Sequence, residues 1–143
     1  MTVPLVLPDS KQVAIDLLTA AMPGVRVVGR LPEGAALNGA VPAVRVLRVG
    51  GTADMRGWSD PATRDRPRFS IDCYDVSEGA AMRLAMRVRA EWELLPGRST
   101  DTGTVTGISE ETGPQDRPED PNSDISRVGM ILGMSVRPPL PNS

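Results

Sequence analysis

The sequence contains no histidine and only one cysteine, Cys73. Histidine is the usual general base near neutral pH and the commonest metal ligand in proteins, so its absence argues against both kinds of site. One cysteine excludes an intrachain disulfide and a zinc site built of thiolates. Cys73 occupies an inward position of a predicted strand, and no histidine is present to activate it. We therefore expect a buried, unreactive thiol rather than a nucleophile, and we expect no enzymatic activity.

Aromatic side chains and lysine are also scarce, and the net charge is small. Aromatic residues make up 3% of the 143 residues and hydrophobic residues 40%, which predicts an aliphatic core. No apolar run is long enough to span a membrane and no signal-peptide pattern occurs, so we expect no membrane contact. The net charge of −2 gives no bulk electrostatic reason to bind nucleic acid. Lys11 is the only lysine, and the other basic residues are arginines, whose planar guanidinium groups suit subunit interfaces.

Hydrophobic periodicity and turn residues predict an α+β fold with two helices and about five strands. The helices are expected at Ser10–Met22 and Ser77–Leu95, each preceded by a capping-box spacing. The order α-β-β-β-α-β-β predicts a mostly antiparallel sheet with both helices on one face. We expect a single domain over 1–143, with an extended arm at 1–8 and a loose tail at 138–143. The strands are expected at Val25–Leu31, Ala43–Val49, Arg68–Tyr74, Thr102–Ile108 and Ile125–Val136.

The alternation of residue types predicts which side chains face the core. In the third strand, Phe69, Ile71 and Cys73 are expected to face inward and Ser70, Asp72 and Tyr74 outward. The second helix is expected to bury an apolar stripe that includes Trp92. Its other face carries arginine and glutamate four residues apart, which favours a salt-bridged outer surface over a nucleic-acid surface. These pairs are Arg87 with Glu91 and Arg89 with Glu93.

Two segments are predicted to be long loops, and they supply the candidate interaction residues. The first, Gly50–Pro67, contains Met55 and Trp58, which either pack within the loop or anchor a partner protein. It also contains the candidates Arg64 and Arg66. Its paired glycines do not form a phosphate cradle, because no lysine follows them and no strand-to-helix junction is present.

The second predicted loop, Glu110–Asp124, is acidic and rich in proline. Its spacing does not match a calcium-binding loop, so a solvated, charge-steering loop is favoured over a calcium or magnesium site. No cofactor or metal is expected. The acidic candidates are Glu110, Glu111, Asp116, Glu119, Asp120 and Asp124.

Several short motifs resemble the tail-terminator proteins of long-tailed bacteriophages. In that family a strand ends in an aromatic–acid pair and runs into an alanine-rich helix. A Gly-Pro and Asp-Pro loop then leads to a last strand ending in Val-Arg. The matching residues here are Tyr74-Asp75, Leu94-Leu95-Pro96-Gly97, Gly113-Pro114, Asp120-Pro121 and Val136-Arg137.

The resemblance implies a virion structural protein that assembles in the host cytoplasm. It implies a homo-hexameric ring on the end of the tail tube, which stops tube polymerisation and offers a surface to the head-completion (stopper) protein. Genomic DNA would pass through the ring without sequence-specific binding. The resemblance implies no catalytic or cofactor-binding residue.

Alternatives remain open at this point. The chain is also compatible with another neck component, such as a head-completion, stopper or connector protein, and with a minor metal-dependent hydrolase that lacks histidine. Within the ring hypothesis, the acidic segment either lines the lumen, where like charge keeps DNA from adhering, or faces arginines of a neighbouring copy.

Overall fold

The structure is a computed structural model that describes residues 6–55, 62–117 and 124–139. The described residues form one five-stranded sheet in the order β1-β2-β3-β5-β4. The predicted α+β class and the predicted element order are confirmed. The elements are α1 (Ser10–Ala21), β1 (Arg26–Val28), the 3-10 helix η1 (Gly34–Gly39), β2 (Ala43–Met55), β3 (Ala62–Asp75), α2 (Glu78–Glu93), β4 (Thr104–Arg117) and β5 (Ser126–Arg137).

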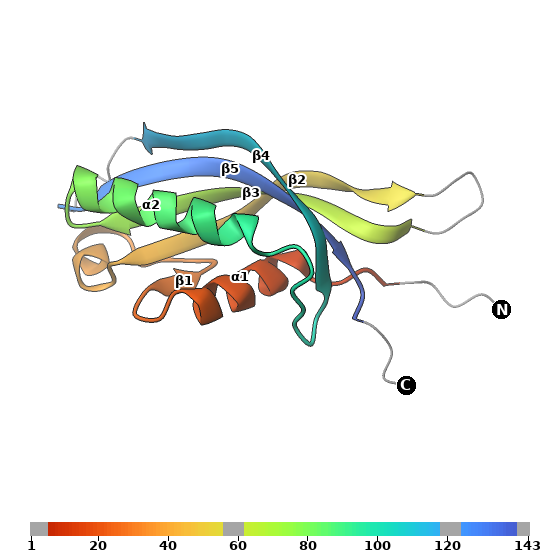
Figure 1. The fold of residues 1–143 in the computed structure, drawn as a ribbon. Coiled ribbons are helices and arrows are strands. Elements are labelled where there is room, and N and C mark those ends of the chain that lie inside the picture. Colours follow the sequence, from red (N-terminus) through yellow and green to blue (C-terminus); the bar gives the residue numbers. More distant parts are fainter. Residues whose placement is uncertain (1–5, 56–61, 118–123, 140–143) are drawn as a thin grey trace.

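The sheet is mostly antiparallel, as predicted. Among the described strands, only β1 pairs in parallel, with β2, whereas the β2–β3, β3–β5 and β4–β5 pairs are antiparallel. Both helices lie on one face of the sheet and leave the opposite face largely uncovered (Figure 1). We call these the helix face and the open face. The predicted strand Val25–Leu31 is shorter than expected, and the predicted loop after it contains η1.

Both helices begin within one residue of the predicted start, but the second is capped by Ser77 and not by the Asp75–Glu78 capping box that the spacing predicts. The Asp9 carboxylate accepts a hydrogen bond from the Gln12 N–H at 3.2 Å, and the Ser77 hydroxyl accepts one from the Ala80 N–H at 3.1 Å. Each cap satisfies an N–H that the first turn of a helix leaves without a partner. The apolar stripe predicted for the second helix is buried throughout, and it comprises Ala81, Leu84, Ala85, Val88, Trp92 and Leu95.

The main core lies between the two helices and the helix face of the sheet. Trp92 packs edge-to-face on Phe69, with ring centroids 6.0 Å apart, and its indole N–H donates to the Gly133 carbonyl at 2.9 Å. Burying each such side chain contributes about 1.5–3 kcal/mol. The alternating apolar residues of the last strand are all buried in this core: Val128, Met130, Leu132, Met134 and Val136.

The prediction of a loop at Gly50–Pro67 is wrong. The β2 and β3 strands continue through most of that segment as an antiparallel hairpin, which extends beyond the helices (Figure 1). Because no helix covers either face over most of this segment, the apolar alternation that marks a half-buried strand is missing. Gly51 has φ of +112°, and a Cβ on it would overlap the Arg66 carbonyl across the hairpin. A glycine that resembled a loop signal therefore permits close strand pairing.

The prediction of a loop at Glu110–Asp124 is also wrong over its first half. The edge strand β4 runs to Arg117, so the first acids of the segment are strand residues. The β4–β5 register shifts three times, including between Glu110 and Thr112 and between Thr112 and Gln115. Such irregularities are tolerated at a sheet edge, so the strand can include Gly113 and Pro114. These residues are the reason why the sequence pattern does not predict a strand here.

Candidate interaction surface

Arginine side chains and one buried carboxylate occupy the open face at one end of the sheet. Cross-strand partners in an antiparallel sheet project to the same side, and Arg45 pairs with Asp72, Tyr74 with Arg127, and Arg127 with Arg117. The outward direction predicted for Ser70, Asp72 and Tyr74 therefore holds. All three are nevertheless buried on that face, and Asp72 is completely inaccessible.

Asp72 is the common acceptor of two arginines from different strands. Arg45 donates from Nη2 to Asp72 Oδ2 at 2.7 Å, and Arg117 donates from Nη1 to Asp72 Oδ1 at 3.0 Å. Arg117 also donates to the Ser70 hydroxyl at 3.1 Å. One carboxylate thus serves two guanidinium groups, so this cluster keeps an excess positive charge and fixes the positions of both arginines.

Gly129 makes the Arg117 contact possible. A Cβ built on Gly129 would overlap the Arg117 side chain at its Cδ, Nε and Cζ atoms. The guanidinium of Arg117 therefore lies flat across β5 to reach Asp72 on β3. Any side chain at position 129 has to displace Arg117 from the carboxylate.

A pocket of about 610 Å³ lies between this arginine cluster and the segment of residues 29–37. Arg45, Leu47 and Tyr74 line it from the sheet, together with Arg127. A second hydrophobic cluster holds η1 and the chain around it against the open face: Leu37, Ala40, Tyr74 and Ile125.

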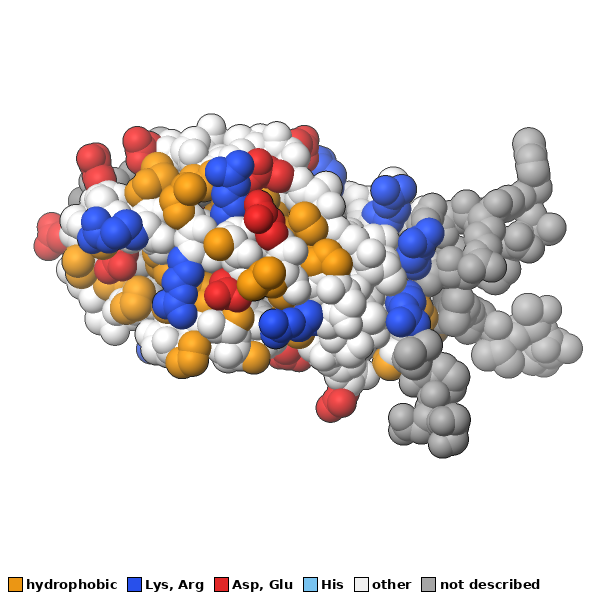
Figure 2. Space-filling model, in the orientation of Figure 1, with side chains coloured by type: hydrophobic (Ala, Val, Ile, Leu, Met, Phe, Trp, Pro, Cys, Tyr) orange, Lys and Arg blue, Asp and Glu red, His pale blue; other side chains and the backbone are white. Residues whose placement is uncertain are grey.

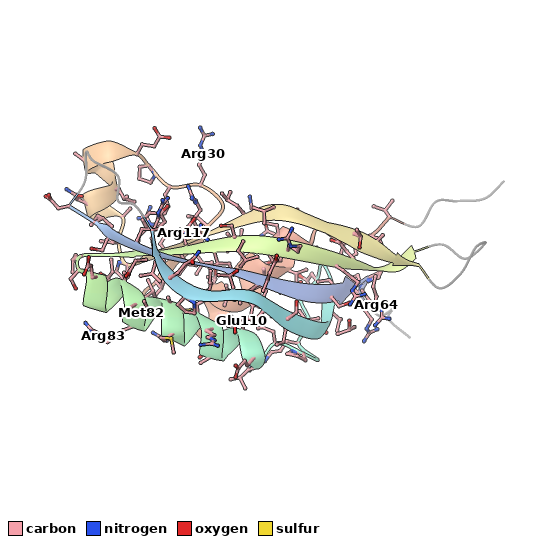
Figure 3. All side chains as sticks on the ribbon, turned by 90° about the horizontal axis from the view of Figure 1, so that it is seen from above. Arg30, Arg64, Met82, Arg83, Glu110 and Arg117 are labelled. Atoms are coloured by element: carbon pink, nitrogen blue, oxygen red, sulfur yellow. The ribbon has the colours of Figure 1, made fainter. Side chains whose placement is uncertain are left out.

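Two arginine N–H groups at this pocket have no acceptor. The Nε atoms of Arg45 and Arg127 are buried, and neither has a hydrogen-bond partner in the described part of the chain. The Arg45 guanidinium carbon lies 5.8 Å from the centroid of the Tyr74 ring, so the ring holds the arginine in place. Arg30 adds an exposed positive charge at the rim, at the same end of the sheet as Arg117 (Figure 3).

A second ionic cluster anchors the hairpin to α1 on the helix face. Arg48 of β2 donates from Nη2 to Asp65 Oδ1 at 2.8 Å, and the buried Ser10 hydroxyl donates to Asp65 Oδ2 at 2.6 Å. Burial by itself would raise the pKa of Asp65, but the hydrogen bonds and the charge of Arg48 outweigh it and lower that pKa. The hydrogen bonds that Arg48 donates to Asp65 raise the pKa of Arg48 in turn.

The candidates of the first predicted loop fall on the hairpin. Arg64 and Arg66 are exposed residues of β3. Met55 is the last residue of β2, and its side chain is not among the described side chains. Trp58 lies in residues 56–61, which are outside the described residues. The interpretation of Met55 and Trp58 as partner anchors therefore stays a prediction.

Two of the predicted acids are bound by arginines of their own chain. Glu111 accepts two hydrogen bonds from Arg68, both 2.7 Å long. Glu110 pairs with Arg89 of α2 at 2.6 Å, so the predicted partnership of Arg89 with Glu93 is wrong. The carboxylate of Glu110 comes from the edge strand β4 beside α2, and the periodicity of the helix alone cannot predict such a partner for Arg89.

The remaining acids are divided between exposed positions and undescribed ones. Asp116 is exposed near the end of β4. Asp124 is also exposed, and its backbone N–H donates to the Asn38 side-chain oxygen at 3.3 Å. Glu119 and Asp120 lie in residues 118–123, outside the described residues. The structure thus brings together Glu110, Glu111 and their arginines, but not the whole acidic set.

The described residues include no group of three or more acidic, cysteine or histidine side chains placed to hold a metal ion. Burial, with a smaller contribution from the charge of Asp72, raises the pKa of the Cys73 thiol far above its ordinary value. No described helix has both the length and the apolar character needed to cross a membrane. Figure 2 shows basic, acidic and hydrophobic side chains interspersed over the face that carries α2, without one continuous patch of a single kind.

The sequence pattern did not predict the residues that build the open-face cluster. It contained one usable signal: Arg45 and Asp72 are opposite charges flanked by apolar residues on two predicted strands, a pattern typical of a cross-strand ion pair. No comparable signal existed for Arg117, because its strand was hidden by glycine, proline and charge. Arg127 follows directly from the last strand once the pairing is known.

Comparison with known proteins identifies the family. Residues 6–143 match the family described as phage tail termination protein. No curated protein sequence matches the chain. Among solved structures, the chain is similar to one chain of the "Virion of native gene transfer agent (GTA) particle", with 16% sequence identity and a TM-score of 0.49, over 87% of this chain and 84% of that one. The family match covers nearly the whole sequence, so the chain belongs to the phage tail termination protein family, whose members are structural proteins of the phage tail.

Proposed function

We propose that this protein caps the end of the tail tube as a closed ring, ends tube polymerisation and provides the surface on which the filled head is joined. Membership of the tail termination family supports the cap, and the resemblance noted in the sequence motifs supports a hexameric ring. In this proposal the protein assembles in the host cytoplasm and remains in the virion, with DNA passing through the ring.

The arrangement of the sheet edges is the structural observation that carries the ring. The three residues of β1 pair only with Ala43 to Arg45, so the rest of β2 forms one edge of the described sheet. The whole of β4 forms the opposite edge. A contact between two different edges, repeated by rotation, closes into a ring when the rotation fits. Open strand edges are also the surfaces that pair most readily with another chain.

The β2–β3 hairpin suits contact with a different virion protein. It extends beyond the helices (Figure 1), and its base is fixed to α1 by the bonds of Asp65 with Arg48 and Ser10. A firmly anchored arm loses little freedom when it binds, so more of its contact energy appears as affinity. We assign to this arm, with Arg64 and Arg66, the contact with the tail tube or the head-completion protein.

The pairing of Glu110 and Glu111 with arginines bears on the proposed lumen. Both acids are neutralised within the chain, so their repulsion of DNA is weaker than the composition of the segment implies. An acid-lined lumen would depend on Asp116, Asp124 and the acids of residues 118–123. The same ion pairs leave Glu110 and Glu111 less available to arginines of a neighbouring copy, so either hypothesis depends on the remaining acids of the segment.

A tube-elongation experiment tests the proposal. Purified tail-tube protein is polymerised alone and with increasing amounts of this protein, and tube lengths are measured by electron microscopy. The proposal predicts shorter tubes, each carrying extra density at one end. Binding to capsids with no effect on tube length would favour the alternative of a head-completion or stopper protein, and a lack of binding to either would contradict both.

A further inference from the structure

The arginine pocket and the tip of the hairpin lie at opposite ends of the same strands. Arg45 and Tyr74 line the pocket near the start of β2 and the end of β3, whereas the pair Met55 and Ala62 lies at the tip of the hairpin. An extended strand from Arg45 to Met55 spans about 30 Å. Figure 1 likewise shows η1 and the hairpin at the two ends of the molecule. Two separate surfaces are therefore available for two different partners.

The pocket carries more positive than negative charge. Arg30, Arg45 and Arg127 line it, and Glu33 is the single acid among the described lining residues. Asp72, which binds Arg45, is already shared between two arginines. The buried Nε–H groups of Arg45 and Arg127 also lack an acceptor in the described part of the chain. The positive charge is thus only partly compensated, and a negatively charged group is the ligand that fits the pocket.

The walls of the pocket favour a carboxylate on an aliphatic stem. Leu31, Leu37 and Leu47 supply apolar surface that suits the methylene groups of an acidic side chain. Guanidinium groups present planar pairs of N–H donors, which match the two oxygens of a carboxylate. The Asp72 carboxylate and the Tyr74 ring already hold Arg45 in place, so little side-chain freedom is lost on binding. The pocket is therefore suited in advance to an acidic side chain.

A nucleic-acid backbone fits the open face less well. Duplex DNA presents a long row of phosphates, and a protein that binds it neutralises several of them with basic side chains. The next arginine along β3, Arg68, donates two hydrogen bonds to Glu111 and is neutralised by it. The uncompensated charge therefore gathers at the pocket, where it favours a single acidic group over a polyanion.

We propose that the arginine pocket is the docking site for an acidic side chain of the virion protein that the hairpin does not contact. The inference rests on the proposed function, in which the cap binds both the tail tube and the head-completion protein. The hairpin engages one of these partners, and the pocket engages the other through Arg30, Arg45 and Arg127. The contact joins opposite charges, so added salt weakens it.

Graded changes of charge at Arg30 test the inference, because this exposed residue lies at the rim of the pocket. The wild type, Arg30→Lys, Arg30→Gln and Arg30→Glu are mixed separately with tail tubes and with capsids that carry the head-completion protein, and co-sedimentation measures binding. Affinity for one of the two particles is expected to fall progressively from Arg30→Lys through Arg30→Gln to Arg30→Glu, by about tenfold or more for the last. Affinity for the other particle is expected to stay at the wild-type level.

Three further variants locate the effect. Arg127→Gln changes the pocket itself and is expected to weaken binding to the same particle as Arg30→Glu does. Arg66→Glu makes an equal change of charge on the hairpin and is expected to weaken binding to the other particle. Arg83→Glu, at an exposed position on α2 (Figure 3), is the matched control and should bind both particles as the wild type does. Circular dichroism and thermal melting verify the fold, and the exposed Arg30 keeps the test valid if Arg127→Gln unfolds.

Several outcomes would overturn the inference. Unchanged binding of Arg30→Glu to both particles would do so while leaving the proposed function intact, and so would weakening of the same particle by Arg30→Glu and Arg66→Glu. Loss of ring formation by Arg30→Glu in light scattering would assign the pocket to a neighbouring copy instead. Competition by duplex DNA that affects the wild type but not Arg30→Glu would assign it to phosphate. A wild type that binds neither particle would contradict the proposed function itself.

Discussion

Replacement of Asp72 by asparagine is the sharpest test of the open-face cluster. The substitution keeps the size of the side chain and removes its charge from between Arg45 and Arg117. Each charge-assisted hydrogen bond contributes about 1.5–3 kcal/mol, and breaking a buried ion pair from one side costs about 3–5 kcal/mol. The arginine side chains are 28% and 21% exposed, so water recovers part of the loss.

We therefore expect Asp72→Asn to lower the free energy of unfolding by about 2–3 kcal/mol. For a chain of this size, that corresponds to a fall in Tm of about 6–10 °C. Urea denaturation followed by circular dichroism measures the change. Gly129→Ala tests the same geometry from β5, because the added methyl group takes the space of Arg117 and separates it from Asp72.

The matched control is Glu111→Gln. It removes the charge from an ion pair whose members, Arg68 and Glu111, are 45% and 51% exposed. Surface pairs of this kind contribute about 0–1 kcal/mol, so the control should change stability little. The reasoning would be refuted if Asp72→Asn and Glu111→Gln unfolded at the same urea concentration.

Three further predictions concern single residues. In the folded state the pKa of Asp65 is lowered from its ordinary value of 3.8, so Asp65 stabilises the fold fully above that value and loses this effect as the pH falls through the folded pKa. Asp65→Asn should therefore reduce the pH dependence of the free energy of unfolding below about pH 4, as measured by urea denaturation at several pH values. Since burial raises the pKa of the Cys73 thiol, a thiol reagent at neutral pH should label the native protein far more slowly than the protein unfolded in urea, and equal rates would contradict the burial. Gly51→Ala should lower the free energy of unfolding by more than Gly24→Ala. Strain at positive φ costs about 1–3 kcal/mol at both sites, but only Gly51→Ala adds an overlap with the Arg66 carbonyl. Faster hydrogen exchange of the hairpin amides should reveal the destabilisation.

The elements that bury one face could be predicted from the sequence alone. The second helix and the last strand carry apolar residues at a constant period because each packs against the same core. The alternation in Val128, Met130 and Leu132 is therefore a direct record of the core-facing side of β5. The cap at Asp9 was equally readable, because a helix start is satisfied by residues close in sequence. The cap of the second helix is Ser77, two residues after the Asp75 that the spacing indicated.

The hairpin and the edge strand could not be predicted in the same way. Residues such as Thr52 and Ala53 have no helix over either face, so burial imposes no period on them. The β4 strand contains Gly113 and Pro114, which mark turns in most contexts. Pairing with β5 holds that segment extended despite its composition, and pairing between distant strands leaves little trace in local sequence.

The open-face cluster was unreadable for a related reason. Asp72 is buried by side chains that arrive from two other strands, one of which was predicted to be a loop. An alternating pattern shows that Asp72 points away from the main core, but not that arginines cover it. The candidate residues on the hairpin and the acidic segment remain predictions about partners rather than about the fold.

Electron cryomicroscopy of tail tubes incubated with this protein tests the central claim most directly. We predict one closed ring at a single end of each tube, with β4 of each copy lying against the β1–β2 side of the next. Single copies scattered along the tube wall, or tube ends without added density, would contradict the account.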